Sequence, residues 1–265
     1  KQLNYKQEQL KNRLKKMNKA IIAFSGGVDS SFLLNFTHKI LGENTIAVTI
    51  NAPFISPREI IEAKEFTKMK KIKHKIINIE MKEIKTIATN PIDRCYHCKK
   101  LLFLKIKEYA TKENINYVLD ASNYNDLNDY RPGMKALKEL EIESPMIDVK
   151  LTKEDIRLLS KEMNLKTWKK PSMACLASRF PYETSITPSK LEKVEKSEEY
   201  IQSLGVNQIR VRYYDQMARI EVLKNDFNII LESSNKIVEF MKKIGFKYIT
   251  LDLDGYRTGS LNEDL

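Results

Sequence analysis

The sequence predicts an α/β protein with a parallel sheet covered by helices on both faces, followed by a small C-terminal α+β domain. Apolar runs of strand length alternate with helix-like segments in the first 165 residues, and this order changes after residue 188. Alternation of this kind requires crossover connections, which place helices on a parallel sheet. The expected strands are 19–25, 45–50, 74–79, 116–121 and 144–149, and the expected helices are 29–40, 57–71, 98–113, 133–141 and 152–164.

The C-terminal part has a different pattern. A helix at 191–204 precedes two alternating strands, 208–214 and 217–223, which form a hairpin candidate around Asp215 and Gln216. A helix at 229–244 and a strand at 247–252 follow. The segment 166–188 contains three prolines and little periodicity, so it is predicted to be a long lid-like loop. We therefore expect three regions: 1–165, 166–188 and 189–265.

Bulk composition narrows the class of protein. The chain has 265 residues, 42% of them hydrophobic, and a formal net charge of +11. This charge favours anionic partners such as nucleotides or RNA, although Lys-rich composition alone also explains it. No apolar run is long enough to cross a membrane, and the amphipathic start, with Leu3, Leu10 and Leu14, lacks the apolar centre of a signal peptide. With three cysteines and no disulfide framework, we expect a cytoplasmic protein.

The segment 21–31 predicts a phosphate site. An apolar strand ends at Ser25, Gly26 and Gly27, and a helix then begins near Ser30 and Ser31. Glycines permit close backbone approach to an anion, and the helix start supplies unpaired N–H groups and a positive dipole end. Asp29 would repel phosphate, so we expect it to act through Mg²⁺. The Lys of a Walker loop is absent.

A polar loop follows the strand at 116–121. It contains Asn123, Asp126 and Arg131, which we expect to contact a nucleotide or its metal, although a cluster of Asx turns would have the same composition. Ligands of parallel sheets bind beyond the carboxyl ends of the strands. Ser25, Asn51 and Asp120 all follow such ends, so three loops are expected to converge there.

Cysteines form the second set of candidates. Cys95 and Cys98 have a C-x-x-C spacing, which is typical of metal, cluster or redox sites but also occurs in buried structural pairs. Cys175 is a candidate third ligand, and three cysteines suit a 4Fe–4S cluster with one open iron. Arg179, Lys169 and Lys170 flank Cys175 and would favour a thiolate nucleophile. A core cysteine is the alternative.

Basic residues recur in the C-terminal strands. Arg210 and Arg212 alternate, so both point to one face of a sheet, where they could bind phosphate or carboxylate. Glu221 lies on the returning strand and could bind a metal or hold an arginine. Arg257 lies in a glycine-containing turn near the end of the chain. A solvated sheet face would explain the same pattern.

Two resemblances combine these motifs. Ser25 to Ser31 resembles the PP-loop of ATP pyrophosphatases, whose adenine nucleotide α-hydrolase-like fold matches the pattern above. With Arg94–Cys98, Asn123–Gly133, Pro171–Arg179, Arg210–Glu221 and Gly255–Arg257, the chain resembles the LarE family of ATP-dependent sulfur transferases.

That resemblance implies a reaction. ATP would adenylate a carboxylate of a pyridinium dicarboxylate mononucleotide in nickel-pincer nucleotide synthesis, and pyrophosphate would leave. Cys175 would then attack and form a thioester. The resemblance also implies that Arg210, Arg212 and Arg257 hold substrate and that Glu221 and Asp226 bind Mg²⁺. It further implies that the protein is a homo-oligomer. Because all three cysteines are present, we expect a 4Fe–4S cluster that relays sulfide from a donor, instead of loss of the sulfur of Cys175.

Three other functions share part of this pattern. A tRNA-thiolating PP-loop enzyme with a 4Fe–4S cluster is the main alternative, and the net charge favours it. An amide ligase would use the same loop with inert cysteines. A non-catalytic iron–sulfur or zinc protein would release no pyrophosphate.

Overall fold

The computed structural model describes residues 2–128, 132–171, 174–257 and 259–260. These residues form two compact units, which are described separately. Unit 1 comprises Lys1–Ile84 and Asp93–Met173, and unit 2 comprises Lys85–Ile92 and Ala174–Leu265. Residues 85–92 therefore belong to unit 2 although they lie between two segments of unit 1, and the chain from residue 174 onward belongs to unit 2. The final transition falls inside the segment predicted as a lid loop.

Unit 1 is built on a parallel sheet of four strands in the order β3-β2-β1-β4. The strands are β1 (Ala20–Ala23), β2 (Thr45–Asn51), β3 (Lys73–Asn78) and β4 (Tyr117–Leu119). β1 lies between β2 and β4, with Ile21 opposite Ile46 and Val118. Continuous burial along β1 and β2 explains their uninterrupted apolar sequence.

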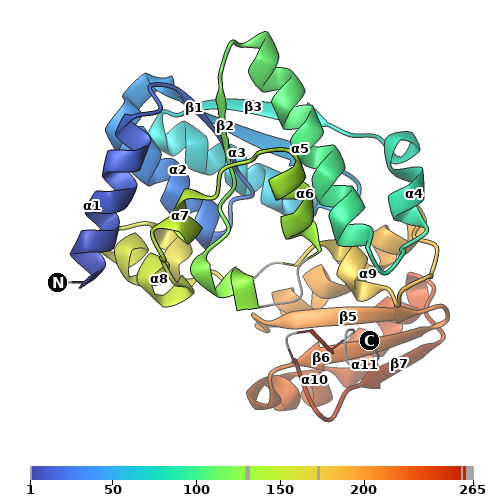
Figure 1. The fold of residues 1–265 in the computed structure, drawn as a ribbon. Helices are drawn as coiled ribbons and strands as arrows, with labels where there is room; N and C mark the ends of the chain where they lie inside the picture. Colours follow the sequence, from blue (N-terminus) through green and yellow to red (C-terminus); the bar gives the residue numbers. More distant parts are fainter. Residues whose placement is uncertain (1, 129–131, 172–173, 258, 261–265) are drawn as a thin grey trace. The chain divides into compact units, whose positions relative to one another are not determined.

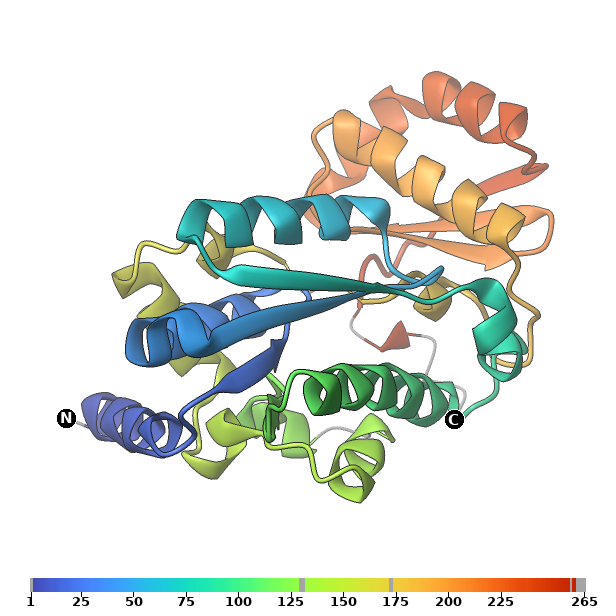
Figure 2. The same ribbon diagram turned by 90° about the horizontal axis from the view of Figure 1, so that it is seen from above.

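Helices cover both faces of this sheet, as predicted. Because crossovers are right-handed, the reversal of strand order after β3 brings the next helix to the opposite face. Figures 1 and 2 show α3 and α5 on opposite sides of the strands. The helices of unit 1 are α1 (Gln2–Lys15), α2 (Val28–Leu41), α3 (Pro57–Lys70), α5 (Arg94–Lys112), α6 (Gly133–Glu139), α7 (Pro145–Asp148) and α8 (Lys153–Glu162).

The main core of unit 1 joins the amphipathic first helix to the sheet. Leu10 and Leu14 of α1 are fully buried in one core cluster with Phe32 and Leu33 of α2 and Ile156 of α8. At about 25 cal/mol per Å² of apolar surface, each such side chain contributes roughly 1.5–3 kcal/mol. The core thereby fixes the start of α2, where the glycine loop lies.

One predicted strand is wrong. Residues 144–149 form the short helix α7 instead of a fifth strand. Among the residues that the structure describes, pairing beyond β4 is limited to a single bridge between Leu119 and Glu143. Pro145 then occupies the first helical position, where its missing N–H costs nothing and its fixed φ favours the helix. Met146 is fully buried, and Ile147 and Val149 are half-buried, so packing and not strand structure explains the apolar composition.

Unit 2 contains a three-stranded sheet in the order β5-β6-β7. β5 (Ile209–Tyr214) and β6 (Met217–Val222) form the predicted antiparallel hairpin, and β7 (Tyr248–Leu251) joins β6 in parallel. The helices are α4 (Lys85–Ala88), α9 (Pro188–Ser203), α10 (Phe227–Glu232) and α11 (Ser234–Lys243). The single helix predicted at 229–244 is therefore two helices, which meet at Ser233.

Candidate functional site

The glycine loop of unit 1 connects β1 to α2. Gly26 has φ +75°, a left-handed conformation that favours glycine, and Gly27 precedes the first residue of α2. The Ser25 hydroxyl lies 3.1 Å from that of Ser30 and accepts from the Gly27 N–H at 3.4 Å. The loop therefore presents two hydroxyls and a helix N-terminus on one side, the arrangement that binds phosphate.

A cavity of about 280 Å³ opens beside this loop within unit 1. Its size is close to the lower limit of about 300 Å³ for small-molecule pockets. Ser25, Asp29, Ser30 and Asp126 supply polar groups to its wall. Its apolar lining includes Val48, Ile50, Ile55, Ile60, Leu102, Phe103 and Ile106. An apolar pocket with a phosphate cradle at one end suits a nucleotide.

Convergence of loops at the strand ends is partly confirmed. Ser25 and Asp120 both line the cavity. Asn51 is not among its lining residues, and its carboxamide donates to the Asn78 side chain at 2.9 Å on the next strand.

Asp29 is the most unusual group in this site. Burial raises its pKa, and the nearby Asp126 carboxylate adds to that rise, whereas Lys153 opposes it. The Lys153 ammonium lies 2.6 Å from Oδ2 of Asp29, and the Asn123 amide donates to the same oxygen at 3.5 Å. Its other oxygen, Oδ1, is buried and has no hydrogen-bond partner within the described part of the chain.

That oxygen is suited to a cation. Mg²⁺ is usually held by one or two carboxylates together with substrate phosphates, and Asp29 and Asp126 supply two carboxylates beside a phosphate cradle. Ser31 is also buried beside the loop, and its hydroxyl has no partner among the residues described. The residues present therefore fit the ATP and Mg²⁺ that the sequence predicted.

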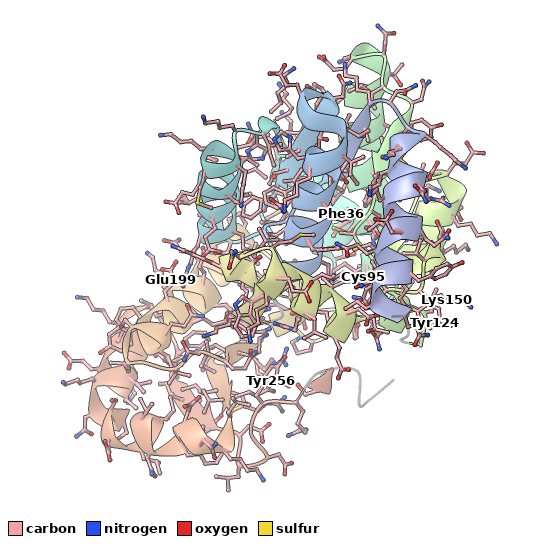
Figure 3. The ribbon with its side chains drawn as sticks, turned by 90° about the vertical axis from the view of Figure 1, so that its left-hand side faces the viewer. Phe36, Cys95, Tyr124, Lys150, Glu199 and Tyr256 are labelled. Atoms are coloured by element: carbon pink, nitrogen blue, oxygen red, sulfur yellow. The ribbon has the colours of Figure 1, made fainter. Side chains whose placement is uncertain are left out.

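The polar loop after β4 is ordered by its own side chains where it is described. The Asn123 N–H donates to Asp126 at 2.9 Å, and the Asn125 N–H donates to Asn123 at 3.0 Å, so the Asx turns of the alternative interpretation are present. The Tyr124 N–H donates to the Leu151 carbonyl, and Figure 3 shows Tyr124 beside Lys150. Arg131 lies outside the described residues.

Two lysines contact the glycine loop and the start of α2, and the sequence analysis did not predict these contacts. Lys153 opens α8 beside a capping box of Thr152 and Asp155, and that helix-start signal was the only local clue to its position. Lys170 donates to the Gly26 carbonyl at 3.0 Å and contacts the Glu62 carboxylate. Both lie more than 100 residues from their partners.

The cysteines belong to different units. Cys95 (labelled in Figure 3) and Cys98 are one helical turn apart at the start of α5, and Cys95 is exposed. Cys175 is exposed in unit 2. None of the three cysteines is part of a disulfide. Across the ranges that the structure describes, no three His, Cys, Asp or Glu side chains gather as a metal site.

The cations that flank Cys175 in sequence have other partners. Arg179 pairs with Glu198 through two hydrogen bonds of 2.8 Å and donates to the carbonyls of Ala174 and Cys175. Lys169 lies 5.0 Å from the centre of the Trp168 ring. The Arg179 contacts fix the backbone at Cys175 and leave its thiol exposed.

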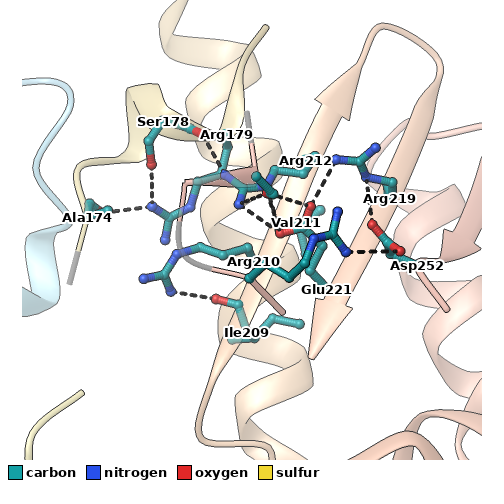
Figure 4. A network of polar contacts seen from close by, with 12 residues as sticks. Ala174, Ser178, Arg179, Ile209, Arg210, Val211, Arg212, Arg219, Glu221 and Asp252 are labelled. Atoms are coloured by element: carbon teal, nitrogen blue, oxygen red, sulfur yellow. Dashed lines mark hydrogen bonds and ion pairs between the residues drawn. The ribbon is translucent and has the colours of Figure 1, made fainter. Parts of the chain in front are cut away.

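Buried arginines form a network in unit 2 (Figure 4). Arg212 holds Glu221 through hydrogen bonds of 3.0 and 2.7 Å and donates to the Ser178 carbonyl. Arg219 contacts the other oxygen of Glu221 at 2.9 Å. Burial lowers the pKa of Arg210, the Arg179 charge adds to this effect, and the Tyr256 ring lies 5.3 Å away.

Glu221 is fully buried and both its oxygens are engaged, also by the Ser260 hydroxyl. A metal ion there would compete with two guanidinium groups. Asp226 lies at the N-terminus of α10 and is partly exposed. Arg257 is also partly exposed and pairs with Asp254 at 3.5 Å. The metal role of Glu221 and Asp226 and the substrate roles of the arginines stay predictions.

Comparison with known proteins relates the whole chain to a few others. Residues 2–115 match the NAD synthase family model. An uncharacterized protein of Synechocystis sp. is 37% identical over 99% of both chains. The pyridinium-3,5-bisthiocarboxylic acid mononucleotide synthase of Lactiplantibacillus plantarum is 32% identical over 95% of this chain and 92% of its own. An uncharacterized protein of Methanocaldococcus jannaschii is 35% identical over 94% and 96%.

Proposed function

Because the chain belongs to the LarE family of PP-loop enzymes, the family of the Lactiplantibacillus synthase, we propose that it is an ATP-dependent sulfur transferase of nickel-pincer nucleotide synthesis. Its substrate would be a pyridinium dicarboxylate mononucleotide, a carboxylate of which is adenylated while pyrophosphate leaves. The observation that carries this proposal is the cavity beside the glycine loop, with Asp29 buried at its polar end.

The residues of unit 1 have distinct roles in adenylation. The N–H groups at the start of α2 and the hydroxyls of Ser25 and Ser30 bind the phosphates that leave as pyrophosphate. Asp29 and Asp126 would hold Mg²⁺, which when bound would supply positive charge beside those phosphates. The apolar side chains of the cavity take the adenine and exclude water, which protects the acyl adenylate from hydrolysis.

Where no cluster is bound, Cys175 is the nucleophile of the second step. Its thiolate attacks the adenylated carbonyl carbon, the bond to AMP breaks, and a thioester forms. The Arg179 hydrogen bonds to the carbonyls of Ala174 and Cys175 keep the backbone fixed during this attack. Arg210, Arg212 and Arg257 supply positive charge for the anionic nucleotide substrate.

Cys95, Cys98 and Cys175 are also the proposed ligands of a 4Fe–4S cluster. Cys95 and Cys98 lie three residues apart on α5, about one helical turn, which suits two ligands of one cluster. Cys175, from unit 2, would be the third. When bound, such a cluster supplies an open iron for hydrosulfide. A sulfide donor is therefore an expected partner, and homo-oligomerisation is a further expectation.

Iron analysis tests the cysteine assignment. Protein purified without oxygen should contain about four irons and about four sulfides per chain. Cys95→Ala should lose most of this iron, because two thiolates hold a cluster weakly. His97→Ala is the matched control: His97 lies between the two cysteines, is partly exposed and contacts Asp93 at 2.9 Å, so its removal should leave the iron unchanged.

The mass of the spent protein separates the two sulfur sources. With the cluster as relay, Cys175 keeps its mass after ATP-dependent turnover with sulfide present. Loss of one H₂S at Cys175, or equal iron in wild type and Cys95→Ala, would remove the cluster mode and leave the adenylation step standing. Absence of ATP-dependent pyrophosphate release with the dicarboxylate substrate would overturn the proposed function itself.

A further inference from the structure

We propose that His74 is a positioning residue for the glycine loop, which it orders through the hydroxyl of Thr49 and the carbonyl of Phe24. The inference rests on the proposed function, because it assumes that this loop binds the phosphates of ATP. His74 is a half-buried titratable group on β3, inside unit 1, and the reaction above does not use it. Both of its ring nitrogens contact threonine hydroxyls.

These contacts form a chain across three elements of unit 1. The Nδ1 atom of His74 lies 2.9 Å from the hydroxyl of Thr67 on α3, and Nε2 lies 2.8 Å from the hydroxyl of Thr49 on β2. The Thr49 hydroxyl in turn donates to the Phe24 carbonyl at 2.7 Å, and both threonines are buried. The Phe24 ring meets the imidazole edge-on, with 6.2 Å between the ring centres. The imidazole is therefore held on three sides.

The number of available hydrogen atoms gives this chain a direction. A hydroxyl has one hydrogen, and a neutral imidazole donates through one nitrogen and accepts through the other. Burial lowers the pKa of His74 below its ordinary value, and the Lys64 charge adds to this effect, so the ring is neutral at pH 8. The neighbouring strands β1 and β2 contain no titratable side chain that would reverse it.

Only one tautomer of the ring satisfies the Phe24 carbonyl. With the proton on Nε2, the ring donates to Thr49, whose own hydrogen stays on that carbonyl. Nδ1 then accepts from Thr67, whose hydroxyl can leave the Ala63 carbonyl because this carbonyl lies inside α3 and accepts a helical N–H. With the proton on Nδ1, Thr49 would donate to the ring. The buried Phe24 carbonyl would then have no donor among the described residues, which is costly.

The Phe24 carbonyl is the point at which this chain reaches the phosphate site. It shares a planar peptide unit with the Ser25 N–H, so the two groups can only turn together. That N–H donates to the Ser30 hydroxyl at 3.3 Å, and the hydroxyls of Ser25 and Ser30 lie 3.1 Å apart. Holding the carbonyl therefore fixes an N–H that orients one of the hydroxyls assigned to the phosphates. His74 thus acts through the backbone and without contact to ATP.

Nitrogen NMR of the imidazole rings tests the tautomer in the wild-type protein. The chain has three histidines, and the signal that is missing from His74→Gln identifies that of His74. At pH 8 the wild type should carry the His74 proton on Nε2 alone. A proton on Nδ1, or exchange between the two tautomers, would overturn the proposal.

ATP binding in the presence of Mg²⁺, measured by calorimetry without the carboxylate substrate, tests the consequence for the loop. Thr49→Val keeps the side-chain shape and removes the hydroxyl, and His74→Phe keeps a ring and removes both nitrogens. Each should weaken ATP binding about ten-fold, because a buried hydrogen bond is lost. The double variant should bind no more weakly than either single variant, since both changes break the same chain. His74→Gln can still donate to Thr49 and should restore binding.

Thr45→Val is the matched control. It makes the same change at a buried threonine of the same strand, whose hydroxyl has no partner in the described part of the chain. It should bind ATP as the wild type. Equal losses in Thr45→Val and Thr49→Val, or wild-type affinity in both Thr49→Val and His74→Phe, would contradict the positioning role. If the wild type itself binds no ATP, the proposed function fails first, so the two failures are distinguished.

Discussion

At the scale of single residues, conformation and burial distinguish groups that the sequence treats as equal. Gly26 and Gly27 are neighbours in the loop, yet only Gly26 has a positive φ. Asp29 and Asp126 both line the cavity, yet burial raises the pKa of Asp29 and leaves one of its oxygens without a partner among the described residues. Such differences decide which residue is indispensable and which can be replaced.

Gly26→Ala isolates the conformational requirement. A Cβ atom there would meet nothing closer than 3.8 Å, so the cost comes from φ +75° alone. We expect a loss of about 1–2 kcal/mol in unfolding free energy and weaker ATP binding. Gly27→Ala, at φ −76°, should cost less stability. Urea unfolding of both variants checks this, and equal losses would contradict it.

At the scale of elements, the loop depends on its neighbours α3 and α8. Lys153 and Arg157 are both on α8, and Glu62 is on α3. Burial by itself raises the pKa of Glu62, but the hydrogen bond and charge of Lys170, helped by Arg58, outweigh burial and lower it. The ion pair of Lys170 with Glu62 thus ties the chain near residue 170 to α3, and its strength depends on pH.

Glu62→Gln measures this dependence. A lowered pKa means that the carboxylate stabilises the folded state fully above the unfolded value near 4.5 and loses this effect as pH falls through the folded pKa. At pH 7 the free energy of unfolding of the wild type should exceed that of Glu62→Gln by up to about 1 kcal/mol, since Glu62 is one third exposed. The gap should close on acidification.

Urea unfolding between pH 7 and pH 3 supplies the measurement. Glu65→Gln is the control, because it makes the same chemical change at an exposed position of the same helix. A gap that stays constant with pH would exclude the ion pair as its source.

At the scale of the whole molecule, the second unit is discontinuous in sequence. Asn90 lies in the segment 85–92 of unit 2, is fully buried and adopts φ +59°. Its side chain donates to the carbonyls of Phe180 and Pro181 at 3.2 and 2.6 Å, and its own carbonyl accepts from Glu183. Unit 2 therefore needs residues far outside the predicted region 189–265.

In the described residues no helix is long and apolar enough to span a membrane.

Asn90→Ala should loosen unit 2 selectively. It removes two hydrogen bonds and places alanine in a left-handed conformation, so we expect a loss of about 2–4 kcal/mol. Hydrogen exchange should then accelerate in β5 and β6 and remain slow in β1 and β2. Thr89→Ala, at the exposed neighbouring position, should change neither sheet. Uniform acceleration in both units would show that they unfold together.

The sequence alone determined the parallel sheet, the helices on its faces, the glycine loop and the C-terminal hairpin. Each is encoded locally, by apolar periodicity or by turn residues, so short segments suffice to predict them. The strand predicted at 144–149 was wrong, because this apolar segment contains the short helix α7. The family resemblance of the sequence was confirmed by relatives that span the chain.

Only the tertiary structure decided which charges meet. Lys153 lies 124 residues from Asp29, and Lys170 lies 144 residues from Gly26. Arg212 and Arg219 lie opposite each other in the β5–β6 hairpin and share the buried carboxylate of Glu221. The apolar periodicity of the sequence does not predict such pairs, because they form where separate elements pack and a buried charge needs a partner. That requirement joins the residues before Cys175 to the loop that the sequence had already assigned to phosphate.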